Sequence, residues 1–517
     1  MTTLLPLIAL ASPACLGIVA LLSLAQPGPR PQGLIRATGL AAYVGLAVAA
    51  VLAVLVATNG ALVTPLLGVE GLGASIRLDA LSVLIFSMVA LLGVVILRFS
   101  RTYLDGDARQ GAFLGRMALT IASVEVLVVS GNVALFVAAW IATSLSLHTL
   151  LLFYPERPAA VAAAKKKFIA ARIGDACLVG AAAILYTQFG TGDLGAIFTQ
   201  AAAGTGNLEL EVATALIAVA ALFKSAQFPT HGWLVEVMET PTPVSALLHA
   251  GILNAGPFLI MRFATVMELG TASAVFLVVG GGFTALFASV VLLTQPSVKV
   301  ALGYSSAAHM GFMLLICGLG VYPAAVLHLV AHSFYKAHAF LSSGSVVEVA
   351  RAAPVKVPER LRSPLRALVS FAVAAGIYFG LAVALGFTPA DNPALLAVGA
   401  ILVLGLTQLL APAIDSAGTA GGMARAAGLA VVVTLAFFGL EEGARLLLIE
   451  ALPVPHQPVA LIIALASVVL AGFAAAIGLQ VLGLRPTSRL RQRAYVATRN
   501  GLYANSIFDR VVGTYRA

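Results

Sequence analysis

The sequence has few charged residues for its length. Of 517 residues, 30 are lysine or arginine and 21 are aspartate or glutamate, so only 10% are charged. A soluble domain usually carries about 25% charged residues, whereas 60% of this chain is hydrophobic. The composition therefore excludes an ordinary soluble enzyme and indicates a protein that lies in a membrane.

Cysteines and nucleotide-binding motifs are also scarce. The three cysteines, Cys15, Cys177 and Cys317, lie inside apolar runs without paired spacing, so they indicate neither a disulfide framework nor a thiolate metal site. The chain has no phosphate-binding loop, dinucleotide fingerprint or nucleophile motif, and we predict no cofactor, no ATP-driven pump and no catalytic residue. Its net charge of +9 comes from basic residues in the loops between apolar runs, which argues against nucleic acid as a partner.

Long apolar runs are what the sequence has in abundance. A run of about 20 apolar residues can cross a bilayer as an α-helix, and these runs are too long and uniform for the strands of a membrane barrel. We predict an all-α polytopic membrane protein in contact with membrane lipid, with residues 1–517 forming a single transmembrane domain. About fifteen spans are expected, at 4–25, 34–57, 78–98, 112–130, 133–153, 168–189, 212–239 with a break, 243–266, 274–294, 299–320, 322–349, 364–386, 394–414, 424–446 and 457–483.

The charges in the loops predict the orientation. Basic residues gather in loops 98–116, 154–172 and 349–366 and in the tail 484–517, while the loops of opposite parity are acidic or uncharged. Basic loops stay on the cytoplasmic side of a membrane. We therefore expect a basic cytoplasmic tail and, with an odd number of spans, an N-terminus outside.

Residues 222–251 place several ionisable groups around a broken helix. This stretch holds Lys224, His231, Glu236, Glu239 and His249, and also Pro229, Pro241 and Pro243. Backbone freed by a break is tolerated at membrane depth where it lines a polar cavity, as in ion transporters. We predict that the helix opens near Pro229 and that Lys224 and His249 belong to a proton path, while His231, Glu236 and Glu239 are access or partner-facing groups.

Other ionisable residues also lie inside predicted spans, where a charge needs a partner or water. His328, His332 and Lys336 follow one another at i, i+4 and i+8 along one helix face. Glu125 lies in the middle of its span, and Lys299 begins the next span, where an interfacial lysine is the alternative interpretation. The predicted proton path thus comprises Glu125, Lys224, His249, Lys299, His328, His332 and Lys336.

Some of the ionisable residues also have simpler interpretations than a proton path. His328 and His332 are spaced like zinc ligands, but the sequence offers no third and fourth ligand at useful spacing, so we predict no metal site. His309 and His338 are equally consistent with hydrogen-bonded packing residues. His148 and the run Lys165–Lys167 are expected at the membrane interface.

Three sequence blocks resemble a known superfamily. FKSAQFPTHGWLVEVMETPTPVSALLHAG, SVKVALGYSSAAHMGFM and HLVAHSFYKAHAFLSSGSV are similar, in order and spacing, to the proton-conducting antiporter-like subunits of respiratory complex I and Mrp antiporters. The resemblance covers roughly residues 75–350. It implies two inverted five-helix repeats with broken helices, here 112–266 and 274–414. It also implies that Lys224 is the lysine of the first broken helix, and that His249, His328, His332 and Lys336 continue a central polar axis.

The chain departs from the superfamily pattern at two places. Complex I subunits of this type carry a glutamate directly after the tryptophan that corresponds to Trp140, whereas this chain has Ile141. We expect Glu125 to replace it as the partner of Lys224. The second repeat is degenerate, because residues 364–414 contain no acid or base in mid-span and Gln408 is the most polar residue inside.

Within the superfamily, the motifs HGWL and VMETPTPVSALLHAGI and the shorter C-terminus make the chain similar to the DabB family of bacterial inorganic-carbon accumulation complexes. That resemblance implies a bacterial inner-membrane protein paired with DabA, a large zinc-containing cytoplasmic protein similar to β-carbonic anhydrases. It further implies that H+ or Na+ flow through this chain drives hydration of CO2 to bicarbonate by the partner. The alternatives are a complex I or Mrp-type antiporter subunit and a scaffold that transports nothing.

Overall fold

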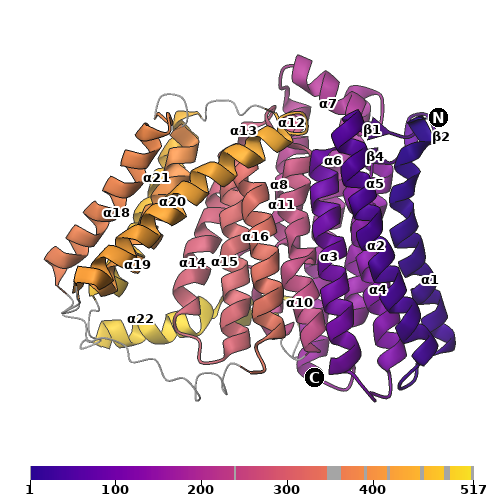
Figure 1. Cartoon of the computed structure of the whole chain (residues 1–517), viewed down its shortest axis with the longest axis horizontal. Helices are drawn as coiled ribbons and strands as arrows, with labels where there is room; N and C mark the ends of the chain where they lie inside the picture. The colour runs from indigo at the N-terminus through magenta and orange to yellow at the C-terminus, as the bar shows by residue number, and fades with distance from the viewer. Residues whose placement is uncertain are drawn as a thin grey trace.

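The computed structural model describes residues 2–237, 240–345, 363–388, 393–415, 420–453, 459–482 and 489–513. Long helices stand side by side in a bundle that is wider than it is tall (Figure 1). Thirteen helices in the described part of the chain are long and apolar enough to cross a membrane. The prediction of an all-α polytopic membrane protein is therefore confirmed.

The N-terminal third forms one end of the bundle. A 3-10 helix, Thr2–Leu10, leads into α1, and α1 packs on α2 and α4 while α2 packs on α3. Two minor antiparallel pairs lie between α2 and α3: β1 (Leu62–Val63) with β4 (Arg77–Leu78), and β2 (Leu67–Val69) with β3 (Leu72–Ala74). The helices are α1 (Ala11–Ala25), α2 (Gln32–Asn59), α3 (Ala80–Tyr103), α4 (Gln110–Val129), α5 (Val133–Leu151) and α6 (Pro158–Phe189).

The middle of the chain contains the interrupted helices. The break after α8 is the predicted one, and further interruptions follow near Gly251 and at a π-helical turn, Leu277–Gly281. The elements are α7 (Leu194–Ala203), α8 (Leu208–Lys224), α9 (Gly232–Glu236), α10 (Thr242–Ala250), the 3-10 turn Ile252–Asn254, α11 (Ala255–Arg262), α12 (Ala264–Met267), α13 (Thr271–Phe276), α14 (Gly282–Leu292), α15 (Val298–Gly318) and α16 (Tyr322–Leu341).

The C-terminal helices α18–α21 lie at the other end of the bundle (Figure 1), where α18, α19 and α20 share a small core of their own. Beyond them, α22 runs across the ends of the long helices rather than along them. The elements are α18 (Pro364–Ala384), α19 (Pro393–Asp415), α20 (Ala420–Leu448), α21 (Ala460–Leu482), α22 (Arg489–Arg499), the 3-10 turn Gly501–Tyr503 and α23 (Ala504–Val512).

Two details differ from the sequence-based expectation. The helices α8 (17 residues) and α16 stand in the same bundle but are not among the thirteen apolar helices, so the count of fifteen spans stays a prediction. The broken helix expected in the second repeat is not found in α18 or α19, which are each continuous over their described residues, whereas the π-helical turn Leu277–Gly281 interrupts the first helix of that repeat.

Candidate functional site

Lys224 is buried at the last turn of α8, against α5. Its ammonium group donates hydrogen bonds to the Trp140 carbonyl oxygen (3.1 Å) and to Thr143 Oγ1 (2.9 Å). It also lies 4.2 Å from the centre of the Trp140 ring, a distance at which a cation is attracted to the ring face. The positive end of Lys224 is thus held by one neutral helix face.

The chain leaves the helix directly after Lys224. Residues 225–231 contain Pro229, as predicted, but the helix already ends at Lys224, five residues before that proline, and Ala226 has a positive φ of 51°. Side chains satisfy the freed backbone: the Phe228 amide donates to Thr284 Oγ1 (3.1 Å) and Gln227 Nε2 donates to the Ser225 carbonyl oxygen (2.7 Å). The polar backbone groups at the break therefore have hydrogen-bond partners, which non-helical backbone at membrane depth requires.

Glu125 does not pair with Lys224, so that prediction is wrong. Its carboxyl group is buried on the side of α4 that faces α1 and α2, next to Ser12 and Gly45. Lys224 instead lies against Trp140 and Thr143 of α5. Glu125 and Lys224 therefore belong to different helix contacts, although sequence alone could not show which face of α4 the carboxylate takes.

The acid whose charge reaches Lys224 is Asp175 of α6. Asp175 interacts electrostatically with Lys224 and forms an ion pair with Arg172 (2.5 Å). Sequence reasoning missed this pair: Asp175 lies inside the predicted span 168–189, but Arg172 was assigned to the basic loop 154–172, whereas both belong to one helix that begins at Pro158. Proline in the first helical turn followed by an alanine-rich stretch was the available signal for the earlier start.

The longer α6 also places two lysines inside the protein, which corrects the prediction that Lys165–Lys167 lie at the interface. Lys165 is exposed, but Lys166 and Lys167 are buried. Lys167 Nζ donates to the carbonyl oxygen (2.5 Å) and the hydroxyl (3.0 Å) of Ser144. A cavity of about 10 Å3 has both Lys167 and Lys224 in its wall. The site around Lys224 therefore contains a second buried basic side chain that was not predicted.

The access groups lie close to these lysines. Glu236 forms an ion pair with Lys166 (2.5 Å). His231 is buried, stacks on Phe228 and interacts electrostatically with Lys166. His148 is half-buried against Phe168. Glu239 lies outside the described residues.

A second polar cluster lies on α15 and α16, at the predicted residues. His309 Nδ1 and His328 Nε2 are 3.0 Å apart, and His332 completes a group whose ligand atoms all lie within 4.8 Å of one another. Lys336 donates to Ser305 Oγ (2.7 Å), and the ring of His249 from α10 stacks on Phe340 at 4.2 Å. His309 thus belongs to the cluster, whereas His338 is exposed.

The three histidines have the spacing of a metal site, with His309 as the third ligand that sequence spacing did not reveal. Lys336 nevertheless acts electrostatically on His309 and His332. A divalent cation in this apolar interior would bear uncompensated charge beside another cation, which is costly. The cluster is better suited to passing protons between neighbouring rings.

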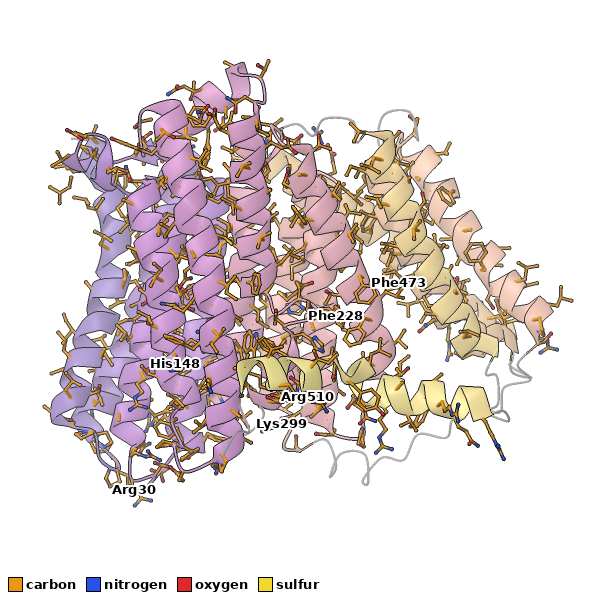
Figure 2. All side chains as sticks on the ribbon, turned by 180° about the vertical axis from the view of Figure 1, so that it is seen from behind. Arg30, His148, Phe228, Lys299, Phe473 and Arg510 are labelled. Atoms are coloured by element: carbon orange, nitrogen blue, oxygen red, sulfur yellow. The ribbon has the colours of Figure 1, made fainter. Side chains whose placement is uncertain are left out.

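An interrupted helix joins the two clusters. Ser225, next to Lys224, donates to the Leu253 carbonyl oxygen (2.9 Å), and Asn254 Nδ2 donates to Ser333 Oγ (2.7 Å), next to His332. At the end of the bundle where α15 begins, Lys299 is half-buried and donates to Thr242 Oγ1 (3.0 Å) (Figure 2). The structure therefore connects the Lys224 site to the α15–α16 cluster through the interrupted helix, while Lys299 lies at the end of the bundle.

Comparison with known proteins shows the family to which this chain belongs. The model of the NADH:quinone oxidoreductase/Mrp antiporter transmembrane family matches residues 130–392, about half of the chain. A protein named "Probable inorganic carbon transporter subunit DabB2" from Halothiobacillus neapolitanus is 40% identical over 377 residues, which cover 72% of this chain and 68% of that protein. This chain belongs to that antiporter-like family, within its DabB group.

Other members of the family agree over a shorter stretch. "Probable inorganic carbon transporter subunit DabB" from Hydrogenovibrio crunogenus is 44% identical over 278 residues, 53% of this chain and 54% of that protein. NADH-quinone oxidoreductase subunit L from Escherichia coli is 37% identical over 280 residues, 53% of this chain and 46% of that protein. The chain thus spans about half the length of these two relatives.

Two solved structures share the fold of this DabB-group chain. The Mrp complex from Dietzia sp. DQ12-45-1b matches with a TM-score of 0.57 and 23% identity, over 97% of this chain and 56% of the matched chain. The archaeal membrane-bound sulfane sulfur reductase matches with a TM-score of 0.59 and 16% identity, over 99% of this chain and 100% of the matched chain. At these identities the likeness supports the fold alone.

The position of Glu125 gives a first prediction for this family member. Replacing Glu125 with glutamine, which keeps the shape and removes the charge, is expected to change transport by less than about twofold, or about 0.4 kcal/mol, because Glu125 does not contact Lys224. Ion flux in proteoliposomes, compared with wild type and with Asp175→Asn, measures the effect. A loss of ion flux as large as that caused by Asp175→Asn would show that Glu125 takes part in the proton path.

Proposed function

We propose that this chain is the cation-conducting membrane subunit of an inorganic-carbon transporter, and that the cation is the proton. The observation that carries the proposal is Lys224: a buried lysine at a helix break, held by neutral groups of α5 and within electrostatic reach of Asp175. A lysine held in this way can release and recover a proton at modest cost, since burial disfavours its charge and a nearby carboxylate favours it.

The α15–α16 cluster supplies the second half of the path. Protons would pass from the Lys224 site, past the interruption at Leu253–Asn254, to His249, Lys336 and the three histidines. Each step exchanges a proton between groups that can be donor or acceptor, which suits histidine at physiological pH. The hydrogen bonds from Ser225 to Leu253 and from Asn254 to Ser333 support this order, because they hold the two clusters in fixed relation.

The coupling partner is proposed from the relatives' names and the resemblance of the motifs. We propose that the chain pairs with a DabA-like zinc-containing cytoplasmic protein that hydrates CO2 to bicarbonate, and that the ion gradient makes this hydration one-way. The chain would then lie in the bacterial inner membrane, with its N-terminus outside and its C-terminus in the cytoplasm, as the charges of its loops predict.

A growth assay tests the proposal. A bacterium that lacks carbonic anhydrase and cannot grow in air is expected to grow when it produces both this chain and the zinc protein encoded beside it, and not with either one alone. An uncoupler is expected to abolish carbon uptake in these cells. Uptake that persists with the uncoupler would contradict the proposal and support a scaffold that transports nothing.

The second candidate function is a subunit of a complex I or Mrp-type antiporter. The similarity to NADH-quinone oxidoreductase subunit L of Escherichia coli over half the chain favours it. This alternative predicts co-purification with several other membrane subunits, together with quinone- or sodium-linked activity. Co-purification with a single zinc-containing partner would decide for the first candidate.

A further inference from the structure

The C-terminal strap, residues 499–513, crosses the end of the bundle where α15 begins (Figures 1 and 2). It touches elements from distant parts of the chain. At one end Gln295 Nε2 donates to the Arg499 carbonyl oxygen (3.1 Å), and at the other Lys165 Nζ donates to the Gly513 carbonyl oxygen (3.4 Å). Between them, Gly501 lies against Tyr304. The strap therefore spans from the α14–α15 loop to α6.

The strap brings a carboxylate to a buried lysine. Lys166, whose side chain is 0% exposed, forms ion pairs with Asp509 of the strap (2.5 Å) and with Glu236 of α9 (2.5 Å). It also donates to Asn505 Oδ1 (3.1 Å), and Asn505 Nδ2 donates to Glu236. One lysine between two carboxylates leaves an excess of negative charge, which attracts a monovalent cation or a proton.

This cluster stands next to the Lys224 site. Lys166 precedes Lys167 on α6, and the small cavity beside Lys167 and Lys224 has Trp233 of α9 in its wall. The strap packs tightly against α9 at Gly232, the residue before Trp233. A β-carbon at Gly232 would overlap the side chain of Asn505. The short helix α9 is thus held between the strap and the cavity.

We propose that Lys166, Glu236 and Asp509 form the inner gate of the cation path to Lys224, and that the strap closes this gate by holding α9. For a cation to pass, Asp509 and Asn505 must move away from Lys166 and Glu236, which frees α9 and opens the cavity. This inference rests on the proposed function, because it assigns a gate to the same path. A purely structural strap would make the same contacts but would not need to move.

A reversible disulfide separates these two cases. The Asn505 β-carbon lies 3.1 Å from the position of a β-carbon at Gly232, near the spacing of about 3.5–4.5 Å that a disulfide requires. The test protein is the full chain with Gly232→Cys and Asn505→Cys, in a background where Cys15, Cys177 and Cys317 are replaced by alanine. Each single-cysteine variant is the matched control.

Potential-driven proton flux is measured in proteoliposomes before and after oxidation. The oxidised double variant is expected to lose at least about tenfold of the flux, and dithiothreitol is expected to restore it, while the single variants do not respond. Equal flux in the locked and reduced double variant, with the disulfide confirmed by mass spectrometry, would overturn the gate. Failure of the disulfide to form would also overturn it, because the strap would then not lie on α9.

A second variant avoids dependence on the engineered pair. Asp509→Asn removes one carboxylate from the gate and keeps the shape of the side chain, so passive proton flux is expected to rise by about threefold or more. Unchanged or lower flux would count against the gate. The reduced double variant tests the proposed function separately. If it shows no proton flux, the proposed proton path is contradicted. If it shows flux that oxidation does not change, only the proposed gate is contradicted.

Discussion

Replacing Lys224 with methionine is expected to reduce ion flux and partner-dependent carbon uptake by about 100-fold or more. Methionine fills a similar volume but carries no proton, so the site loses the ionisable group that lies against Trp140 and Thr143 of α5. The fold is expected to survive, because Thr143 Oγ1 donates to the Trp140 carbonyl oxygen (2.7 Å) and keeps these groups paired without the lysine. Flux in proteoliposomes and thermal unfolding in detergent measure the two effects separately.

Two further variants show what Lys224 contributes. Lys224→Arg keeps the positive charge but cannot release its proton, so it is expected to be as inactive as Lys224→Met if the lysine carries protons. An active arginine variant would mean that only a fixed charge is needed. Arg30→Met removes an exposed basic residue that pairs with Asp105 and is expected to keep most of the flux. Growth rescue by Lys224→Met would contradict the proposed role.

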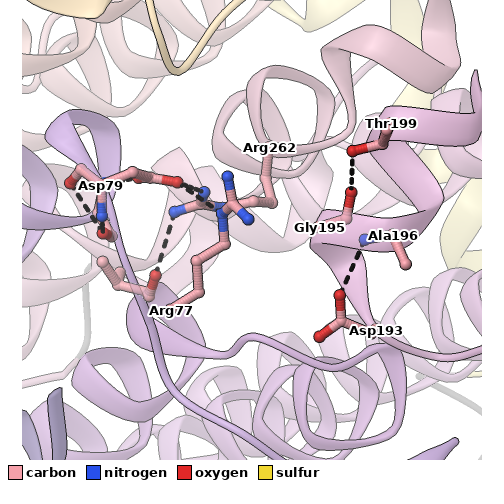
Figure 3. A network of polar contacts seen from close by, with 9 residues as sticks. Arg77, Asp79, Asp193, Gly195, Ala196, Thr199 and Arg262 are labelled. Carbon is pink, nitrogen blue, oxygen red and sulfur yellow. Dashed lines mark hydrogen bonds and ion pairs between the residues drawn. The ribbon is translucent and has the colours of Figure 1, made fainter. Parts of the chain in front are cut away.

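Replacing Asp79 with asparagine is expected to lower the free energy of unfolding by about 3–5 kcal/mol. Asp79 begins α3 and forms ion pairs with Arg262 of α11 (2.6 Å) and with Arg77 (2.9 Å) (Figure 3). Asparagine can still accept the Ser82 amide hydrogen bond that caps α3. The substitution therefore isolates the loss of charge, which leaves Arg262 buried without a counter-ion.

A double variant tests that explanation. Asp79→Asn combined with Arg262→Met removes the uncompensated charge, and it is expected to be more stable than Asp79→Asn alone. Asp105→Asn, which breaks an exposed ion pair with Arg30, is expected to change the melting temperature little. Thermal unfolding of the purified proteins compares all three. A double variant less stable than the single one would show that Arg262 stabilises the bundle by packing rather than through its charge.

The same ion pair predicts how stability depends on pH. Burial raises the pKa of Asp79, but the charges of Arg262 and Arg77 and the Ser82 amide outweigh it and hold the pKa well below its ordinary value. A carboxylate with a lowered pKa stabilises the fold above its unfolded pKa of about 3.9 and loses that contribution as the pH falls further. Wild type is therefore expected to lose stability below about pH 4 more steeply than Asp79→Asn.

Much of the candidate site was predictable from sequence because an ionisable side chain inside an apolar span carries a high free-energy cost. An ionisable residue in an apolar run needs a reason, which is why Lys224, His249, His328, His332 and Lys336 could be named from the runs alone. The Lys166–Glu236–Asp509 cluster was not predictable in this way. Lys166 falls in a predicted loop and Asp509 in the predicted tail, where charged residues are common, and the strap lies more than 250 residues from Glu236 in the sequence.

The sequence by itself determined that this chain crosses a membrane many times, where a helix breaks and which spans carry ionisable groups, because hydropathy and proline act locally along the chain. Only the tertiary structure decided which of these groups meet. Glu125 turns toward α1 and α2, Asp175 supplies the charge near Lys224, His309 joins the histidines of α16, and the C-terminal strap reaches Lys166. Helix rotation and packing set those pairings, and the residues on one helix face carry no local signal of which helix they will meet.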